Sequence, residues 1–384
     1  MNPRVRTIGG SLIREIASKC RPSSIDLGLG EPSLPPSTKF LAAALRRTEQ
    51  EGLHYTVNAG DIALRHAIVH HYAYPMFESA ENVCIMTGSQ EAVYVSIKAL
   101  LDPAKDELLV VEPAFPAYAK MARLESVSVR SAAMDPGSDF AFEPQRILAA
   151  MSDRTRLVVI CSPSNPTARV ISRSAAEELA AALLRRAGEP VYVLHDEIYR
   201  EQTFIDDPGE FAAFYPHTIV TNSLSKSNAL TGLRLGWTMA PRPLAEAIVK
   251  THAWVTSAAS TFAQRVALEI FQTPGALGEH AVWYHAQCSA AVGVLRASGL
   301  RFIAPEGSFY ACVQLPDGMS SLSAAHELAD RFDVIAIPGI AFGECFEGWL
   351  RLSWVAPIDR LREGLSRIAE FCGTATAASN RSSN

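Results

Sequence analysis

Short apolar runs, each followed by a helical pattern, repeat along the chain and constrain its fold more than any other feature. Five runs are continuously apolar and rich in β-branched residues, at positions 81–88, 106–114, 156–166, 190–197 and 217–223. Uninterrupted apolar strands are typical of parallel sheets that are buried on both faces. Helical patterns lie between the runs, as at residues 89–101 and 174–188. This alternation predicts an α/β fold in which a mostly parallel sheet lies between two layers of helices.

The size and composition narrow the class of protein. A chain of 384 residues is too long for one ordinary domain, so we expect two compact units that share a site. A long helical pattern at residues 277–299 would lead from the sheet unit into a smaller C-terminal unit. A net charge of -5 offers no basic surface for nucleic acid. The sequence shows no secretory signal and no apolar stretch long enough to span a membrane.

The cysteine pattern indicates the compartment. The seven cysteines are odd in number and scattered, and they form no CxxC pair. We therefore expect free thiols in a reducing compartment, with the cytoplasm as the default, and no disulfide or zinc framework. His70 and His71 lie in a helical segment without metal-ligand spacing, so no metal is expected.

Chemically active side chains follow the predicted strands at the points where each strand ends. Ligands of open parallel sheets bind at the carboxyl ends of the strands, so we expect these side chains to meet. After the first strand, Gly88 turns the chain into a helix whose first backbone N–H groups would face an anion. The side chains after the other four strands are an aromatic, an amide, a carboxylate with a phenol, and two hydroxyls with a lysine: Phe115, Asn165, Asp196, Tyr199, Ser223, Ser225 and Lys226.

Each of these residues has an ordinary structural explanation, but their combination indicates pyridoxal 5'-phosphate. A lysine amine condenses with the aldehyde of this cofactor as a Schiff base. The protonated ring nitrogen needs a carboxylate, and the phosphate needs hydroxyls, backbone N–H groups and a bidentate arginine. Arg234 follows Lys226 by eight residues, and an aromatic ring such as that of Phe115 would fix the plane of the cofactor.

The order of motifs resembles that of the class I/II aminotransferases, which are fold-type I pyridoxal-phosphate enzymes of the aspartate aminotransferase superfamily. The resemblance extends from about residue 25 to residue 353. The matching segments are GLGEP (28–32), HYTVNAGDIALR (54–65), EPAFPAY (112–118), SNPT (164–167), DEIY (196–199), SLSKSNALTGLRLGW (223–237), PEGSFY (305–310), IPGIAFG (337–343) and LRLSW (350–354). One departure is Ala168, which stands where the family usually has glycine.

The resemblance implies a role for each site residue. Lys226 would be the Schiff-base lysine and proton shuttle, and Asp196 would pair with the pyridine nitrogen. Tyr199 and Asn165 would bond the ring oxygen, with Asn165 also near the substrate. The phosphate would be held by Ser223, Ser225 and Arg234, by the N–H groups of Ser89 and Gln90, and by Tyr55 of a neighbouring subunit. Arg351 would bind the substrate α-carboxylate with help from the Gly30 backbone.

The resemblance also implies a large cofactor-binding domain at residues 45–288, a smaller α+β domain formed by residues 1–44 and 289–372, and a disordered tail at 373–384. It predicts a homodimer with shared active sites. The implied activity is transfer of an amino group between an L-amino acid and a 2-oxo acid in ping-pong half-reactions, within amino-acid metabolism or biosynthesis.

Other readings stay open at this level. The same cofactor site could serve a lyase or a cyclising enzyme, since one fold hosts several chemistries. A non-catalytic regulator would need a DNA-binding module, and only about 25 residues precede the first motif. An unrelated α/β binding protein would leave Lys226 buried by accident. The sequence does not identify the amino acid or the oxo acid.

Overall fold

The five predicted strands are present in the structure, a computed structural model that describes residues 5–6 and 8–382. They are β2 (Val83–Met86), β3 (Glu107–Glu112), β5 (Thr155–Cys161), β6 (Tyr192–Asp196) and β7 (Thr218–Ser223). Two further strands of the same sheet were not predicted, namely β4 (Ser128–Ala133) and β8 (Gly236–Met239). β4 is an edge strand in which only Ala132 is buried, and β8 is four residues long, so neither presents an apolar run that is readable as a strand.

The seven strands form one sheet in the order β2-β8-β7-β6-β5-β3-β4. β8 runs antiparallel to both of its neighbours, and the other pairs are parallel. The predicted mostly parallel sheet is therefore confirmed. The parallel strands β3, β5, β6 and β7 direct their carboxyl ends to the same edge of the sheet, where the candidate site residues follow.

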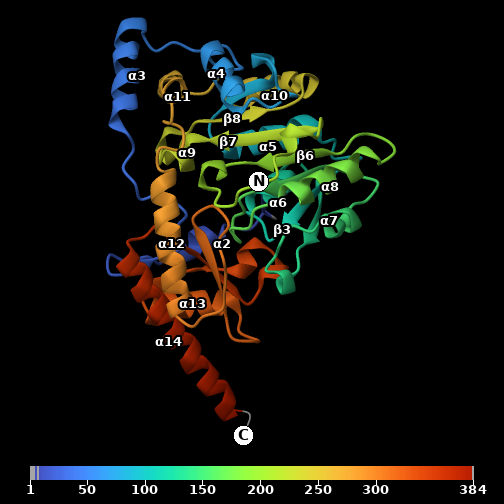
Figure 1. The fold of residues 1–384 in the computed structure, drawn as a ribbon. Helices are drawn as coiled ribbons and strands as arrows, with labels where there is room; N and C mark the ends of the chain where they lie inside the picture. Colours follow the sequence, from blue (N-terminus) through green and yellow to red (C-terminus); the bar gives the residue numbers. More distant parts are fainter. Residues whose placement is uncertain (1–4, 7, 383–384) are drawn as a thin grey trace.

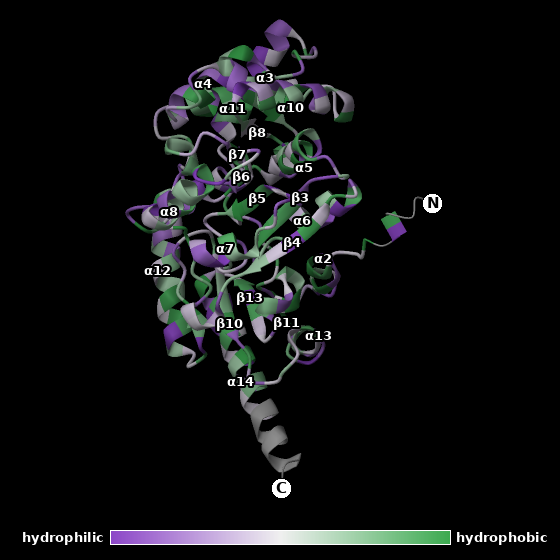
Figure 2. Ribbon diagram, turned by 90° about the vertical axis from the view of Figure 1, so that its right-hand side faces the viewer, coloured by the Kyte–Doolittle hydropathy of each residue, from purple (hydrophilic) through white to green (hydrophobic). Residues whose placement is uncertain are grey.

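Helices cover both faces of the sheet. Figure 2 shows the strands between α7 and α8 on one side and α5 and α6 on the other. The helices are α2 (Leu12–Ala17), α3 (Thr38–Glu51), α4 (Ile62–Tyr72), α5 (Ser89–Leu100), α6 (Ala117–Leu124), α7 (Pro144–Ala150), α8 (Arg173–Leu184), α9 (Leu224–Ser227), α10 (Arg242–Val255), α11 (Thr261–Gln272), α12 (Ala281–Ala297), α13 (Ser321–Arg331) and α14 (Ile358–Ser382). Ser172 begins α8 by accepting a hydrogen bond from the Ala175 N–H, as serine commonly does at a helix start.

A smaller α+β unit lies at one end of the sheet unit, below it in Figure 1. Its sheet has the order β12-β13-β10-β9, formed by Ile337–Pro338, Trp349–Ser353, Tyr310–Gln314 and Phe302–Ile303, with antiparallel pairs. The N-terminal strand β1 (Ile25–Asp26) pairs with β11 (Val334–Ile335), so this unit includes both ends of the chain. Figure 1 accordingly shows the blue α2 among the orange and red elements.

The structure divides these units differently from the expected boundaries in two places. The expected boundary at residue 44 falls inside α3, which packs against α11 of the large unit through contacts such as Arg265 Nη1 to Thr48 Oγ1 at 2.8 Å. The small unit therefore takes its N-terminal part from before Thr38. The expected tail at residues 373–384 is helical as far as Ser382, because α14 continues into it.

Two expectations about cysteines and membranes can be compared with the structure. Cys20, Cys84, Cys161, Cys288, Cys312 and Cys345 are present as free thiols. Within residues 5–6 and 8–382, no helix combines the length and the apolar character that crossing a bilayer requires.

A buried ionic cluster stabilises the segment that follows β6. Glu197 is 1% exposed, and its carboxylate accepts hydrogen bonds from Tyr74 Oη and from Arg200 Nη1, each at 3.0 Å. Arg200 also pairs with Glu210 at 2.7 Å, and His195 Nδ1 lies 3.0 Å from Glu197. His195, which faces away from the site residues, is thus part of the core, as its position on β6 predicted.

Removing the cation of this cluster should leave a buried carboxylate with too few partners. We expect Arg200→Met to lower the free energy of unfolding by about 3 kcal/mol, the usual effect of breaking a buried ion pair. The loss should be greater at pH 8 than at pH 5, because an unpaired Glu197 can be protonated at the lower pH. Urea unfolding followed by circular dichroism at both pH values measures this.

Two further variants test the cause. Adding Glu197→Gln to Arg200→Met should recover part of the stability, since it removes the buried carboxylate that lost its cation. The exposed pair Arg173–Glu177 on α8 is the matched control, and Arg173→Met should change stability by less than about 1 kcal/mol. Equal losses from Arg173→Met and Arg200→Met would contradict the explanation.

Candidate active site

Lys226 lies at the carboxyl edge of the large sheet, in the short helix α9 that begins directly after β7. The Ser223 side chain starts this helix by accepting a hydrogen bond from the Ser225 N–H at 3.1 Å. The Lys226 ammonium donates to the Gly30 carbonyl at 2.7 Å. The structure thus brings together Lys226 and the N-terminal Gly30, which are distant in sequence.

Burial and charge adjust the Lys226 amine. Burial lowers its pKa from 10.5 to about 8, and Arg351, Arg234 and Arg14 act in the same direction. Glu31 acts in the opposite direction. An amine with a pKa near 8 is neutral in about a tenth of molecules at pH 7, far more than an ordinary lysine, and the neutral form is what a nucleophile or proton shuttle requires.

Asp196 ends β6 and is 5% exposed. Its carboxylate accepts hydrogen bonds from Tyr118 Oη at 2.6 Å and from Thr221 Oγ1 at 3.2 Å. Burial raises the pKa of Asp196 above its usual value, although these two hydrogen bonds act in the opposite direction. A carboxylate held by hydroxyls in a buried site is suited to a cationic partner on a ligand.

Tyr118 is a site residue that sequence reasoning did not single out. It is fully buried, and its ring meets the partly buried ring of Phe115 edge-on, with 5.9 Å between the centroids. The available signal was spacing, because Tyr118 follows Phe115 by three residues, and the Tyr118 N–H donates to the Phe115 carbonyl at 3.3 Å in the turn that begins α6. Tyr118 therefore links the Phe115 ring to the Asp196 carboxylate.

Arg351 comes from β13 of the small unit and is 2% exposed. Its Nη1 donates to Asn165 Oδ1 at 3.0 Å, and its Nη2 donates to the Gly28 carbonyl. Among the described residues its Nε has no hydrogen-bond partner. A buried guanidinium whose hydrogen bonds go only to neutral oxygens is suited to a carboxylate ligand. Asn165, Arg351 and the GLGEP segment therefore meet in the structure.

A turn suited to an anion lies at the start of α5. Gly88 has φ of +87° and precedes Ser89, the first residue of the helix. A Cβ on Gly88 would lie 2.6 Å from Arg234 Nη2, so only glycine lets the guanidinium approach the turn. A Cβ on Gly236 would lie 2.7 Å from the Ser89 nitrogen. Arg234 thus lies at the turn that precedes Ser89, and Gln90 follows on the exposed side of the helix.

Glu91 and His252 brace this turn and were also not singled out. Glu91 accepts from the Thr87 N–H at 2.5 Å, from His252 Nδ1 at 3.1 Å and from the Thr256 hydroxyl. Burial would raise the pKa of Glu91, but these hydrogen bonds lower it to about 2. The carboxylate therefore stays ionised near neutral pH and ties the turn to α10.

Tyr55 and Ala168 were also singled out in the sequence, and neither takes part in the contacts described above. Tyr55 is 92% exposed on the segment between α3 and α4, so within one chain it stands apart from the buried site residues. Ala168 has φ of +59°, a backbone conformation that glycine adopts more easily. The departure from the family pattern at Ala168 thus falls where a side chain is strained.

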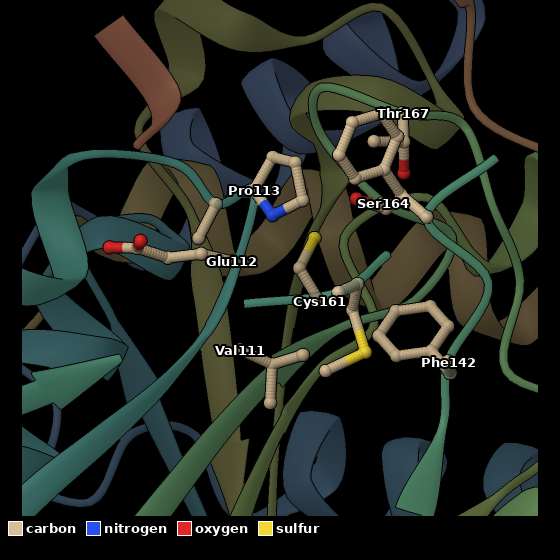
Figure 3. A pocket seen from close by; sticks show the side chains of 10 residues that line it. Val111, Glu112, Pro113, Phe142, Cys161, Ser164 and Thr167 are labelled. Carbon is tan, nitrogen blue, oxygen red and sulfur yellow. The ribbon is translucent and has the colours of Figure 1, made fainter. Parts of the chain in front are cut away.

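A small cavity lies beside the site. Figure 3 shows Pro113, Cys161, Ser164 and Thr167 around it, at the ends of β3 and β5. Its volume of about 10 Å³ admits at most about one water molecule. The cavity therefore cannot hold an amino acid or a cofactor.

The residues of this site fit pyridoxal phosphate. An amine of lowered pKa, a buried carboxylate without a basic hydrogen-bond partner, and a buried phenol at Tyr199 provide the groups that its ring requires. The Gly88 turn and Arg234 provide an anion site at the helix start. No group of His, Cys, Asp or Glu side chains in the described parts of the chain is arranged to hold a metal.

This chain is similar to known aminotransferases in both sequence and structure. Residues 22–368 match the model of the family described as aminotransferase class I and II. The chain is 32% identical to an aspartate aminotransferase of Pyrococcus horikoshii, over 95% of each chain. It is also 32% identical to a probable N-acetyl-LL-diaminopimelate aminotransferase of Bacillus subtilis, over 97% of this chain and 95% of the relative. The structure of an aspartate aminotransferase of Thermotoga maritima superposes with a TM-score of 0.89 at 26% identity, over 97% of this chain and 99% of the other.

The lowered pKa of Lys226 predicts how the apoprotein takes up pyridoxal phosphate. The rate of formation of the visible absorbance band should rise with pH up to about 8 and then level off, because the free-amine fraction saturates above the pKa. Stopped-flow absorbance from about pH 6.5 to about pH 9.5 measures the rate. The same measurement with Nα-acetyl-lysine, whose ε-amine is fully exposed, gives the pH dependence that comes from titration of the cofactor itself.

Lys226→Ala serves as the control and should form no such band. A rate that keeps rising in proportion to hydroxide as far as about pH 10 would mean that Lys226 behaves as an ordinary exposed lysine.

Proposed function

The chain belongs to the class I and II aminotransferase family, and we propose that Lys226 is the lysine that holds its cofactor and moves the proton of the reaction. The protein is a pyridoxal-phosphate-dependent aminotransferase, which transfers an amino group between an amino acid and a 2-oxo acid. When bound, the cofactor supplies an electron sink for the charge that remains after the α-proton is removed. The relatives are aminotransferases and lend no support to the lyase alternative.

The observation that carries this proposal is the Lys226 amine itself. It lies 2.7 Å from the Gly30 carbonyl, and its pKa is lowered by burial and by three arginines. A lysine amine whose pKa is lowered to about 8 is neutral in about a tenth of molecules at pH 7, and in that form it can accept the proton of a bound amino acid and return it to another atom. The Gly30 carbonyl would orient the amine between these two positions.

The neighbouring side chains take complementary roles. Asp196, held by Tyr118 and Thr221, would keep the ring nitrogen protonated. Tyr199 and Asn165 would donate to the ring oxygen. Phe115 would pack on the ring face, a role supported by its edge contact with Tyr118.

The phosphate would be held at the amino end of α5. Its ligands would be the Ser89 and Gln90 N–H groups, the Ser223 and Ser225 hydroxyls and Arg234. The close approach of Arg234 to Gly88 supports this assignment. Glu91 would act indirectly by fixing the turn through the Thr87 N–H.

Arg351 would bind the α-carboxylate that all amino-acid substrates share. Its buried guanidinium and unpaired Nε support this role. The two relatives are named for different amino donors, aspartate and N-acetyl-LL-diaminopimelate, so their names do not select one donor for this chain. The proposed substrate class is therefore an L-amino acid with a free α-carboxylate.

A single half-reaction tests the function. When the holoenzyme meets one amino acid and no oxo acid, the cofactor absorbance should convert once, with one equivalent of 2-oxo acid released per site. This follows because the amino group remains on the enzyme until an acceptor arrives. Diode-array absorbance with a panel of L-amino acids gives both the reaction type and the donor preference.

Lys226→Ala and Arg351→Ala separate the two proposed roles. The first should abolish conversion, whereas the second should raise KM for every donor in the panel by at least about tenfold, since it removes a bidentate charged contact. Continuous release of ammonia without an acceptor would instead identify a lyase.

We also propose that the protein is a homodimer with shared active sites, in a reducing compartment such as the cytoplasm. The compartment is supported by the free thiols of Cys20, Cys84, Cys161, Cys288, Cys312 and Cys345. Large exposed apolar side chains support the dimer, since they gather on the 52–62 segment and at the end of α10: Leu53, Tyr55, Val57, Ile62, Trp254 and Val255. The Asn58 amide, 2.8 Å from the Ser257 carbonyl, joins these two segments into one face.

The segment that carries Tyr55 is held in a defined position. Gln264 of α11 donates to Thr56 Oγ1 at 3.1 Å and accepts from the Asp61 N–H at 2.7 Å. The Thr261 hydroxyl donates to the His54 carbonyl at 2.5 Å. An exposed aromatic on a fixed segment is typical of an interface anchor. We propose that a second copy of this chain packs against this face.

Mixing two defective chains tests the shared site. Tyr55→Ala should bind pyridoxal phosphate about tenfold more weakly, through loss of a charge-assisted hydrogen bond. Lys226→Ala should be inactive. After the two are unfolded and refolded together, about a quarter of the wild-type activity at limiting cofactor should appear, since half of the dimers are hybrids with one intact site.

The matched control mixes Lys226→Ala with Arg351→Ala. Both residues belong to the same chain's site, so no hybrid contains an intact site, and the mixture should show no more activity than its Arg351→Ala chains have by themselves. Recovery in this control, or none in the Tyr55 mixture, would refute a site shared through Tyr55.

A further inference from the structure

Tyr310 is a buried residue of the small unit to which none of the roles above has been assigned. It begins β10, is 2% exposed, and pairs across the strands with Ser353, two residues after Arg351. The Arg351 guanidinium lies over the Tyr310 ring at 4.3 Å from its centroid. The aromatic ring therefore supports the arginine that is proposed to bind the substrate carboxylate.

The Tyr310 hydroxyl reaches the opposite side of the site. It lies 2.9 Å from the Tyr199 hydroxyl, and either oxygen can donate. It also fills the space beside Gly30, where a Cβ would lie 2.0 Å from the hydroxyl oxygen. One side chain thus touches Tyr199 of the large unit, Arg351 of the small unit and the N-terminal segment that accepts from Lys226.

The direction of the hydrogen bond follows from the proposed role of Tyr199. If Tyr199 gives its only proton to the ring oxygen of the cofactor, its own oxygen can only accept. Tyr310 must then be the donor. A hydroxyl that accepts a hydrogen bond becomes a stronger donor itself, because consecutive hydrogen bonds polarise one another. Burial of both phenols keeps water from replacing this bond.

We propose that Tyr310 is a positioning residue whose hydroxyl strengthens Tyr199 as a hydrogen-bond donor while its ring holds Arg351. The inference rests on the proposed roles of Tyr199 and Arg351. It assigns two separable functions to one side chain. The hydroxyl would affect the cofactor, and the ring would affect substrate binding.

Replacement by phenylalanine separates these functions. Tyr310→Phe keeps the ring beneath Arg351 and removes the hydroxyl, so KM for the amino donor should change by less than about twofold. The bound cofactor's visible absorbance should titrate about half a pH unit to one pH unit higher, because its ring oxygen is less well stabilised. Affinity of the apoprotein for pyridoxal phosphate should fall about threefold to tenfold, the effect of one hydrogen bond.

Further variants test the link to Tyr199 and to Arg351. In a Tyr199→Phe background, Tyr310→Phe should produce no additional shift of the absorbance titration, since its partner is already gone. Tyr310→Leu removes the ring and should raise KM for the amino donor by about threefold or more. Tyr215→Phe is the control, because it removes another buried hydroxyl, which donates to the Val191 carbonyl away from the site, and it should leave the titration unchanged.

The outcomes distinguish failure of this inference from failure of the proposed function. If wild-type protein formed no visible band with pyridoxal phosphate, the proposed function would fail. If wild-type protein titrated and Tyr310→Phe titrated at the same pH, or if the shifts of Tyr199→Phe and Tyr310→Phe were additive, the role of Tyr310 alone would be overturned.

Discussion

The parallel strands β3, β5, β6 and β7 end at one edge of a sheet whose faces are both covered by helices, and the rest of the site depends on this arrangement. Positions within such strands are surrounded by apolar side chains, so a polar group there would lose its hydration without compensation. The edge is where the chain leaves the sheet and polar side chains can find partners. Asn165, Asp196 and Lys226 follow three neighbouring strands and so are brought together by backbone geometry before any of their side-chain contacts form.

Burial at this edge of the sheet also shifts the pKa values of the side chains that it brings together. It favours the neutral amine of Lys226 and disfavours the ionised form of Asp196, and both effects arise from the same loss of hydration. The two groups have different kinds of neighbours. Hydroxyls from Tyr118 and Thr221 hold the carboxylate, whereas arginines near Lys226 lower its pKa further. Two titratable groups of opposite type are thus adjusted within one site by their separate surroundings.

The site is complete only where the two units meet. Arg351 comes from the small sheet, and its contacts reach Asn165 of the large unit and Gly28 of the N-terminal segment. Pairing of β1 with β11 brings that N-terminal segment to the small unit. Tyr310 extends the same connection, because it touches Arg351 on one side and Tyr199 on the other. The groups proposed to bind the substrate and the cofactor therefore share contacts across the boundary between the units.

The sequence by itself determined the α/β class, the five apolar strands and the residues at their ends, because continuous burial and strand-end chemistry both leave a local pattern. Family motifs added Arg351, which no local pattern would have assigned. Tertiary structure alone decided the places of Tyr118, Tyr310, Glu91 and His252, since each acts through a contact with a residue distant in sequence. It also decided the edge strand β4 and the short strand β8, whose pairing depends on neighbours more than on their own residues. A sequence records which residues are apolar and which are reactive, whereas the partners of a buried hydroxyl or carboxylate exist only after the chain has folded.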